Sequence, residues 1–283
     1  MVDLHVHTTA SDGTLSPSDT VKHAKKMGIE AIAITDHDTI SGIDEAMKTG
    51  DLVGVEVIPG IEISVDYNGE MHILGFFINK TEGFSKWLNE FRATRKDQNT
   101  KIIQMLNELG FNISFEEVEE FSKEGSIGRP HIASVLMKKG YVKSINEAFD
   151  KYIGAGKKAY VERVRISPKE GIDAILKAGG IPVLAHPKFL GLDENKLDNL
   201  LSQLKSYGLK GIEAYYSLNT SLETGLLLRL AIKHNLLVTG GTDYHGSIKP
   251  DIEMGIGLGD TKVNYSIVNK LKEAQPNKFT FNN

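Results

Sequence analysis

Apolar and polar residues alternate strictly at the start of the chain. Val2, Leu4 and Val6 alternate with Asp3, His5 and His7. A period of two predicts a short β-strand, so the three polar residues are expected to share one side. A single metal ion could bind both imidazoles there, and Asp12 follows in a loop rich in Ser, Asp and Gly. Two ordinary buried histidines are the alternative at this point.

In the rest of the chain, short apolar runs typical of buried strands alternate with amphipathic segments typical of helices. Ser16-Pro17 and Ser167-Pro168, each followed by an acid, mark helix starts with Ser as the N-cap. The expected helices are about 16–27, 43–49, 167–179, 194–207, 222–235 and 265–274. Further strands are expected at 31–34, at 55–58 leading through Pro59-Gly60 into 61–65, and at 71–74, 181–185, 211–214 and 236–239. Asn68-Gly69 is a hairpin turn signal.

Residues 84–152 interrupt this alternation, because their apolar spacing is helical almost throughout. We therefore expect an α/β fold in which residues 1–80 and 169–283 form a barrel domain. Residues 81–168 are expected to form a helical insertion domain. A doubly wound open sheet is the alternative, but it predicts a glycine-rich phosphate loop after the first strand, and Asp12-Gly13 is not one. Polar residues follow the strand ends instead, which favours the barrel.

Composition and charge exclude several classes of site and of protein. The 283 residues include no cysteine, so disulfides and thiolate metal sites are excluded. No apolar run has the length of a membrane span, and a strand beginning at residue 2 leaves no room for a signal peptide, so a cytoplasmic location is expected. The net charge of −4 argues against binding long nucleic acid. Residues 123–169 nevertheless hold eleven Lys and Arg against four Asp and Glu, which indicates either an anion site or a solvated helical face.

Seven of the nine histidines lie at strand ends, in the hairpin or in the motif Gly-Arg-Pro-His at 128–131. Asp12, Glu62 and Asp243 lie in the same segments. Nine candidate metal ligands result: His5, His7, Asp12, His37, Glu62, His72, His186, Asp243 and His245. Nine are too many for one tetrahedral ion and suit two or three divalent ions with a shared carboxylate. Satisfied core histidines are the alternative for any one of them.

Six segments, in order, resemble one known family. They are Leu-His-Val-His-Thr with Ser-Asp-Gly, Ile-Thr-Asp-His-Asp-Thr, Pro-Gly-Ile-Glu-Ile-Ser, Met-His-Ile-Leu-Gly, Leu-Ala-His-Pro and Thr-Asp-Tyr-His-Gly, spanning residues 3–246. They are similar to the PHP (polymerase and histidinol phosphatase) superfamily of phosphoesterases. The helical insertion with Gly-Arg-Pro-His further resembles the branch of nucleoside 3′,5′-bisphosphate phosphatases and 5′-to-3′ exoribonucleases.

The resemblance implies a distorted, TIM-like (β/α)7 barrel with up to three divalent ions, such as Mn, Fe or Zn. It implies that His5, His7, Glu62 and Asp243 hold the first ion. Glu62 would bridge to a second ion, held also by His72 and His186. Asp12, His37 and His245 would hold the third ion. All nine positions match the family's pattern.

The charge of this ligand set predicts an anionic substrate. Three carboxylates carry −3, so two divalent ions leave about +1 and three leave about +3. Attack by metal-bound hydroxide on a phosphate ester is the simplest mechanism, with Asp12, His37, Glu62, His186, Asp243 and His245 as the catalytic set. The sequence does not assign the leaving-group acid.

Arg129 and His131 are candidates for a second phosphate, because a guanidinium can grip phosphate with two parallel hydrogen bonds. Lys188, two residues after His186, is a third candidate contact. The alternative for Arg129 and His131 is a helix start with incidental charge. Weaker candidates are Lys157, Lys158, Arg163 and Arg165. Asp36 and Asp38 could orient imidazole N–H groups.

The leading hypothesis is a metal-dependent phosphomonoesterase acting on nucleoside 3′,5′-bisphosphates or on the 5′ ends of short oligoribonucleotides. A histidinol-phosphate phosphatase uses the same chemistry and is the second hypothesis. A metal-dependent amidohydrolase would also cluster histidines on a βα barrel. A non-catalytic metal-binding module is a further possibility, against which the complete ligand set argues. No membrane partner is expected, and the sequence does not specify an oligomeric state.

Overall fold

The computed structural model describes residues 1–67, 71–122, 128–161 and 166–275. The chain divides into two compact units. One consists of Met1–Phe84 and Arg165–Asn283, and the other of Ser85–Val164. Among the described residues, no helix is both long and apolar enough to pass through a membrane.

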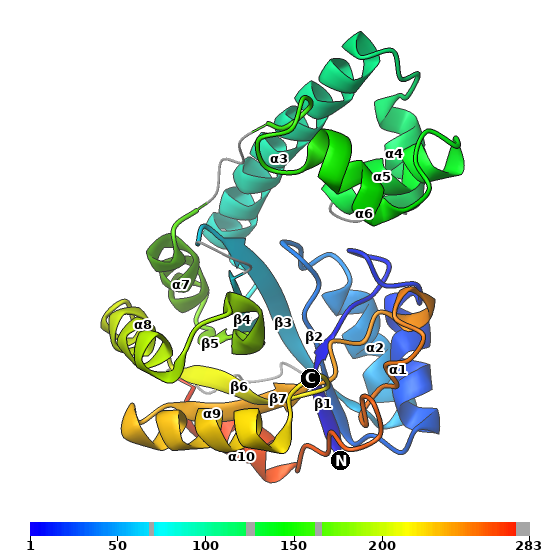
Figure 1. Ribbon diagram of the computed structural model, residues 1–283. Coiled ribbons are helices and arrows are strands. Elements are labelled where there is room, and N and C mark those ends of the chain that lie inside the picture. Colours follow the sequence, from blue (N-terminus) through cyan, green and yellow to red (C-terminus); the bar gives the residue numbers. More distant parts are fainter. Residues whose placement is uncertain (68–70, 123–127, 162–165, 276–283) are drawn as a thin grey trace. The chain divides into compact units, whose positions relative to one another are not determined.

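The first unit is built on a seven-stranded sheet whose spatial order follows the chain (Figure 1). Its strands are β1 (Val2–Val6), β2 (Ala31–Ile34), β3 (Glu56–Val65), β4 (Met71–Phe76), β5 (Ile181–Leu184), β6 (Gly211–Tyr216) and β7 (Leu237–Gly241). All neighbours are parallel except that β4 runs antiparallel to β3 and β5. The first and last strands also meet, because His7 N–H donates to Tyr244 O at 2.9 Å. The sheet is therefore a nearly closed seven-stranded barrel, as predicted.

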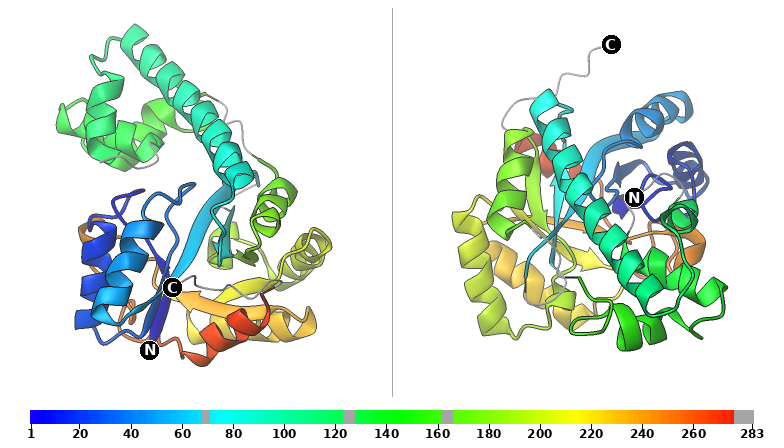
Figure 2. Two further views of the ribbon diagram at one scale, coloured as in Figure 1. Left: turned by 180° about the vertical axis from the view of Figure 1, so that it is seen from behind. Right: turned by 90° about the horizontal axis from the view of Figure 1, so that it is seen from above.

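Helices flank this barrel (Figures 1 and 2). They are α1 (Pro17–Lys26), α2 (Ile43–Val53), α7 (Pro168–Lys177), α8 (Glu194–Ser206), α9 (Ser221–Lys233) and α10 (Ser266–Glu273), with short 3-10 turns at Pro187–Leu190 and Gly246–Ile248. The two predicted helix starts are confirmed, since the hydroxyls of Ser16 and Ser167 accept from the N–H groups of Asp19 and Glu170. Apolar residues of α10 join those of the strands in one core cluster, which includes Leu4, Phe76 and Val183.

Strand β3 continues through Pro59 and Gly60 without a break and changes neighbours there. Residues 56–59 pair with β2, and residues 60–65 pair with β4. A Cβ on Gly60 would lie 2.8 Å from Ile34 O, so only glycine fits this close approach. The β3–β4 pairing confirms the predicted hairpin, whose Asn68-Gly69 turn lies outside the described residues.

Strand β1 carries an irregularity that simple alternation does not predict. Its pairing with β2 advances three residues, from Asp3 to Val6, against two residues of β2. An extra residue of this kind changes which side chains share a face. Asp3 was expected to lie beside the imidazoles of His5 and His7, but its carboxylate accepts hydrogen bonds from Thr242, from Gly255 and from the backbone N–H of His5.

The second unit is helical in its described part. It contains most of α3 (Glu82–Glu108), then α4 (Phe115–Ser122), α5 (Arg129–Lys138), α6 (Ile145–Ala148) and a π-helical turn at Phe149–Ile153. These helices share a core of their own, which includes Leu106, Val118, Ile132, Leu136 and Ile153. The unit therefore packs around apolar residues separate from those of the barrel.

Candidate metal centre

All nine predicted ligands come together in the first unit. They lie on β1 or just after it (His5, His7), in the following loop (Asp12), after β2 (His37), on β3 and β4 (Glu62, His72), after β5 (His186) and after β7 (Asp243, His245). Their ligand atoms form four overlapping groups, each with all atoms within 4.8 Å of one another. The groups are His7–Asp12–His37–His245, His5–Glu62–His186, His5–His7–Asp243 and His37–Glu62–His72. The remaining histidines of the barrel unit, His23 and His234, lie outside these groups.

Glu62 lies at the centre of the cluster, and its two oxygens face different histidines. Oε1 lies 2.9 Å from both His72 Nδ1 and His186 Nε2. Oε2 lies 3.0 Å from His37 Nδ1, 3.3 Å from His7 Nε2 and 3.4 Å from His5 Nε2. The backbone holds Glu62 in place, because its N–H donates to Asp36 O and its carbonyl accepts from Asp38 N–H. One carboxylate therefore presents an oxygen to each of two ligand groups.

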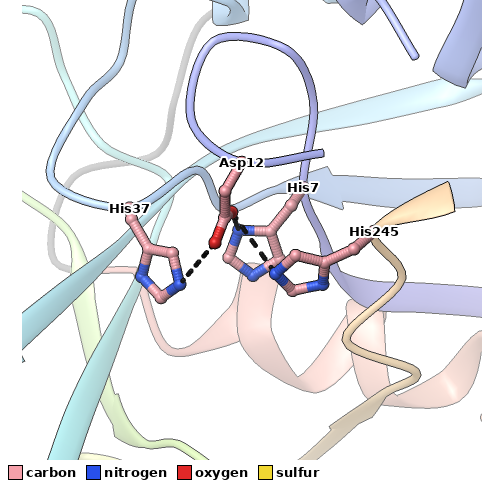
Figure 3. Close-up of side chains that lie close together, drawn as sticks. All are labelled: His7, Asp12, His37 and His245. Atoms are coloured by element: carbon pink, nitrogen blue, oxygen red, sulfur yellow. Dashed lines mark ion pairs between the residues drawn. The ribbon is translucent and has the colours of Figure 1, made fainter. Parts of the chain in front are cut away.

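Asp12 organises a second part of the cluster (Figure 3). Its Oδ1 lies 3.3 Å from His245 Nε2 and 3.5 Å from His7 Nδ1, and its Oδ2 lies 3.7 Å from His37 Nε2. Figure 3 shows the four side chains turned toward one another from three separate segments. Asp36 holds the loop that carries Asp12, since it accepts hydrogen bonds from Thr8 and Ser11 at 2.7–2.8 Å. Asp36 was expected to orient an imidazole, and the structure gives it these loop contacts instead.

Several ligand atoms are buried, and their close contacts with one another lack the geometry of hydrogen bonds. They are His5 Nε2, His7 Nε2, His37 Nδ1 and Glu62 Oε2. Each buried polar atom without a partner costs about 1–3 kcal/mol, and these four converge on one place. Imidazole nitrogens and carboxylate oxygens are suitable ligands for Mn, Fe and Zn. The cluster therefore fits divalent ions.

The cluster keeps its carboxylates ionised. Burial alone would raise the pKa of Glu62, but the imidazoles of His37, His72 and His5 hold that pKa well below its usual value. The pKa values of Asp12 and Asp243 are lowered in the same way by neighbouring histidines, despite burial. For His7 burial works toward a lower pKa, but contacts with Asp243 and Glu62 outweigh it and raise the pKa to about 9. Burial lowers the pKa of His37 to about 3, so this imidazole is neutral at physiological pH.

Comparison with known proteins identifies the family. The PHP domain family matches residues 3–163. A 5′-3′ exoribonuclease of Haemophilus influenzae is 34% identical over 86% of this chain and 89% of its own. The chain belongs to the PHP domain family. A 3′,5′-nucleoside bisphosphate phosphatase of Chromobacterium violaceum is 28% identical to this PHP chain, over 86% of this chain and 87% of its own.

Two solved structures share the fold of this PHP chain. A Bifidobacterium adolescentis protein assigned as a metal-dependent phosphoesterase has a TM-score of 0.82 at 32% identity, covering 98% of this chain and 96% of its own. A Chromobacterium violaceum protein described as an amidohydrolase, with sulfate bound and no metal, has a TM-score of 0.77 at 28% identity, covering 87% of this chain and 88% of its own. This PHP chain is a metal-dependent phosphoesterase, so the hypothesis of a non-catalytic module is wrong.

Glu213, on β6 of the PHP barrel, escaped the sequence analysis. Its buried Oε1 lies 3.0 Å from His5 Nδ1, and its Oε2 accepts from His186 N–H at 2.8 Å. No spacing pattern predicts a role for Glu213, because it is the single acid within the largely apolar strand Gly211–Tyr216. One signal could have identified Glu213. Burying a carboxylate is energetically costly, so an acid within an apolar strand indicates that it has hydrogen-bond or charge partners nearby.

The residues predicted to contact the substrate have hydrogen-bond partners within the PHP chain. Lys188 Nζ bonds both carboxylate oxygens of Glu223 at 2.8 Å. In the second unit, Arg129 is the first residue of α5, and its Nη1 donates to Ile153 O at 3.2 Å. His131 Nδ1 accepts from Gly128 N–H at 3.0 Å and so caps the same helix. Lys157 and Lys158 are exposed, and Arg163 and Arg165 lie outside the described residues.

Proposed function

We propose that this PHP phosphoesterase removes phosphate from nucleoside 3′,5′-bisphosphates or from the 5′ ends of short oligoribonucleotides, with two or three divalent ions as cofactors. The observation that carries the proposal is Glu62, whose two oxygens serve two different ligand groups 2.9–3.4 Å away. A carboxylate shared in this way is the usual bridge of a multinuclear phosphoesterase site. The choice of substrate is supported by similarity to the exoribonuclease and to the bisphosphate phosphatase.

The ligand groups overlap, and we propose one division of the ligands among them. His5, His7 and Asp243, with Oε2 of Glu62, would hold the first ion. His72 and His186, with Oε1 of Glu62, would hold the second. Asp12, His37 and His245 would hold a third. His7 also lies beside Asp12, but its Nε2 faces Glu62 and Asp243, which favours its assignment to the first ion.

Charge explains why such a centre would select a phosphate ester. The three ionised carboxylates carry −3, so two or three divalent ions make the ligand set cationic. Bound divalent ions lower the pKa of water and stabilise charge on phosphoryl oxygens. The protein contributes buried carboxylates held ionised and imidazoles fixed by strand ends, so that little reorganisation accompanies the reaction. Asp12, His37, Glu62, His186, Asp243 and His245 would act in this way.

Arg129, His131 and Lys188 are the proposed contacts to the rest of the substrate. Arg129 and His131 stand in the first turn of α5, where backbone N–H groups and the guanidinium of Arg129 both favour an anion. Lys188 pairs with Glu223, which itself caps α9, so a phosphate at Lys188 would have to compete with that carboxylate. Discrimination between one and two phosphates would then depend mainly on Arg129 and His131.

The proposal is tested by phosphate release from metal-reconstituted protein. The chain is stripped with a chelator, reloaded with Mn²⁺ and assayed on adenosine 3′,5′-bisphosphate, a 5′-phosphorylated tetraribonucleotide, histidinol phosphate and an N-acyl amino acid. We expect kcat/KM at least tenfold higher for one of the first two substrates than for histidinol phosphate. The reverse order would favour the histidinol-phosphate phosphatase.

The amide tests a second candidate function. This candidate is amide hydrolysis, because the Chromobacterium violaceum protein that shares the fold with a TM-score of 0.77 is described as an amidohydrolase. Sulfate bound to that protein is a tetrahedral anion like phosphate. Amide hydrolysis without release of phosphate from any of the esters would contradict the proposal and favour the amidohydrolase.

A further inference from the structure

We propose that Glu213 is a positioning residue that prepares two metal ligands at once, by setting the tautomer of His5 and by holding the backbone of His186. The inference rests on the proposed roles of His5 and His186 as ligands. It concerns how this chain builds its metal centre and does not depend on which phosphate ester is the substrate.

The contact with His5 selects one tautomer. Glu213 is fully buried, and its Oε1 lies 3.0 Å from His5 Nδ1. A carboxylate only accepts hydrogen bonds, so Nδ1 must carry a proton. In the neutral imidazole, the form that binds a metal ion, the lone pair is then on Nε2, which lies 3.4 Å from Glu62 Oε2 and 3.6 Å from Asp243 Oδ1. Glu213 therefore directs the free nitrogen of His5 toward the shared carboxylate.

The contact with His186 supports an uncommon backbone conformation. His186 has φ +25° and ψ +64°, outside the usual range of a residue with a side chain. Its N–H donates to Glu213 Oε2 at 2.8 Å, while its side-chain Nε2 lies 2.9 Å from Glu62 Oε1. The same carboxylate thus fixes a ligand on each side of Glu62.

An isosteric amide cannot replace this carboxylate. The His186 N–H is a fixed donor, so a glutamine at position 213 must turn its oxygen toward His186. Its NH2 group then faces His5 Nδ1, which must become the acceptor, and the proton moves to Nε2. A protonated Nε2 cannot bind a metal ion. The opposite orientation of the amide would leave two donors, NH2 and His186 N–H, facing each other.

Asp3 provides a matched control for the loss of a buried carboxylate. It is also fully buried, and it accepts from the N–H groups of Thr242 and Gly255 at 2.9 and 2.8 Å. Within the part of the chain that the structure describes, its other hydrogen bonds come from the Thr242 hydroxyl and from the backbone N–H of His5 at 3.3 Å, which an asparagine oxygen can still accept, and none comes from an imidazole nitrogen. Asp3→Asn should therefore destabilise the fold without changing the tautomer of His5.

The experiment compares the wild type, Glu213→Gln, Glu213→Asp and Asp3→Asn. Each full-length protein is stripped of metal and titrated with Mn²⁺, and the ions bound per chain, the Kd and the thermal midpoint of the metal-free form are measured. We expect Glu213→Gln to bind at least one ion fewer, or to bind Mn²⁺ about 10–100-fold more weakly. Asp3→Asn should lower the thermal midpoint and keep the wild-type metal count and Kd. Glu213→Asp, which keeps both acceptors on a shorter arm, should fall between the wild type and Glu213→Gln.

Long-range ¹H–¹⁵N spectra of the Zn²⁺-loaded proteins report the tautomer directly. We expect His5 to be protonated on Nδ1 in the wild type and to lose this form in Glu213→Gln. Equal metal binding and an unchanged His5 tautomer in Glu213→Gln would overturn the inference. If the amide does not fold, Glu213→Asp is compared in its place, and wild-type metal affinity in that variant, whose shorter arm lengthens both contacts, would overturn the inference. The proposed multinuclear centre is judged separately, by the metal count of the wild type itself.

Discussion

The hydroxyl of Tyr216 donates a hydrogen bond to Oδ2 of Asp243 at 3.0 Å. Burial and the charge of Asp243 raise the pKa of Tyr216 above its usual value, so the phenol keeps its proton. Lys249 Nζ lies 2.6 Å from the same oxygen. These two donors hold one side of Asp243, while its Oδ1 faces His5, His7 and His245.

This relationship predicts a small, specific effect of Tyr216→Phe. Asp243 loses one of two donors and keeps Lys249, so we expect Mn²⁺ to bind up to about tenfold more weakly. Titration of the metal-free variant with Mn²⁺ measures this change. Tyr215→Phe, at the preceding residue of β6, is the matched control and should bind as the wild type does. An equal loss in both variants would mean that the hydroxyl of Tyr216 has no special role.

Metal binding should release protons near neutral pH. In the metal-free protein the pKa of His7 is raised to about 9, so the imidazole is protonated at pH 7.5 and must lose that proton to bind an ion. The pKa values of His5 and His186 are also raised, so metal affinity should rise with pH through about pH 9. Calorimetric titrations in buffers with different ionisation enthalpies measure the protons released. Release that is the same at pH 7.5 and pH 10 would contradict the raised pKa.

Asp12→Ala should remove catalysis while the barrel stays folded. Asp12 lies 3.3–3.7 Å from the nearest nitrogens of His245, His7 and His37, and its loop is held independently by Asp36. We expect one bound ion fewer per chain and a fall in kcat of about 100-fold or more, the scale of losing a main electrostatic group. Phosphate release and metal analysis test this. The exposed Asp51→Ala on α2 is the control, and full activity of Asp12→Ala would argue against a third ion.

Arg129→Ala should distinguish substrates with one phosphate from those with two. If Arg129 grips the second phosphate, its loss should raise KM about 10–100-fold for a bisphosphate and only slightly for a simple monoester. Its hydrogen bond to Ile153 O also supports the helical unit, so the thermal midpoint is measured as well. Arg229→Ala, on the exposed face of α9, is the control. Equal changes in KM for both substrates would remove Arg129 from the proposed site.

Closure of the barrel depends on a glycine. A Cβ at Gly241, the last residue of β7, would overlap the backbone of His5 on β1. Gly241→Ala should therefore push these strands apart and lower the free energy of unfolding by about 1–3 kcal/mol or more. Gly225→Ala within α9, where a Cβ would meet nothing closer than 3.9 Å, should instead stabilise the protein by about 0.5–1 kcal/mol. Urea denaturation of both variants measures the contrast.

Much of this centre was predictable because metal ligands follow strand ends. His37, His186 and His245 come two to four residues after the ends of β2, β5 and β7, and a barrel gathers such positions at one rim. Glu213 was not predictable in this way, since a single acid inside an apolar strand has no spacing pattern to reveal its partner. The prediction that Asp3 shares a face of β1 with His5 and His7 was wrong, because strict alternation does not account for the extra residue in β1.

The sequence by itself determined the barrel, the helical segment and the nine candidate ligands, because hydrophobic periodicity and the polar residues at strand ends are local properties of the chain. The tertiary structure alone decided which ligand atoms meet. Glu62 divides its oxygens between two groups, and Glu213 reaches His5 across 208 positions of sequence. Such contacts depend on strand register and side-chain direction, and these are defined only when all seven strands have closed around the same core.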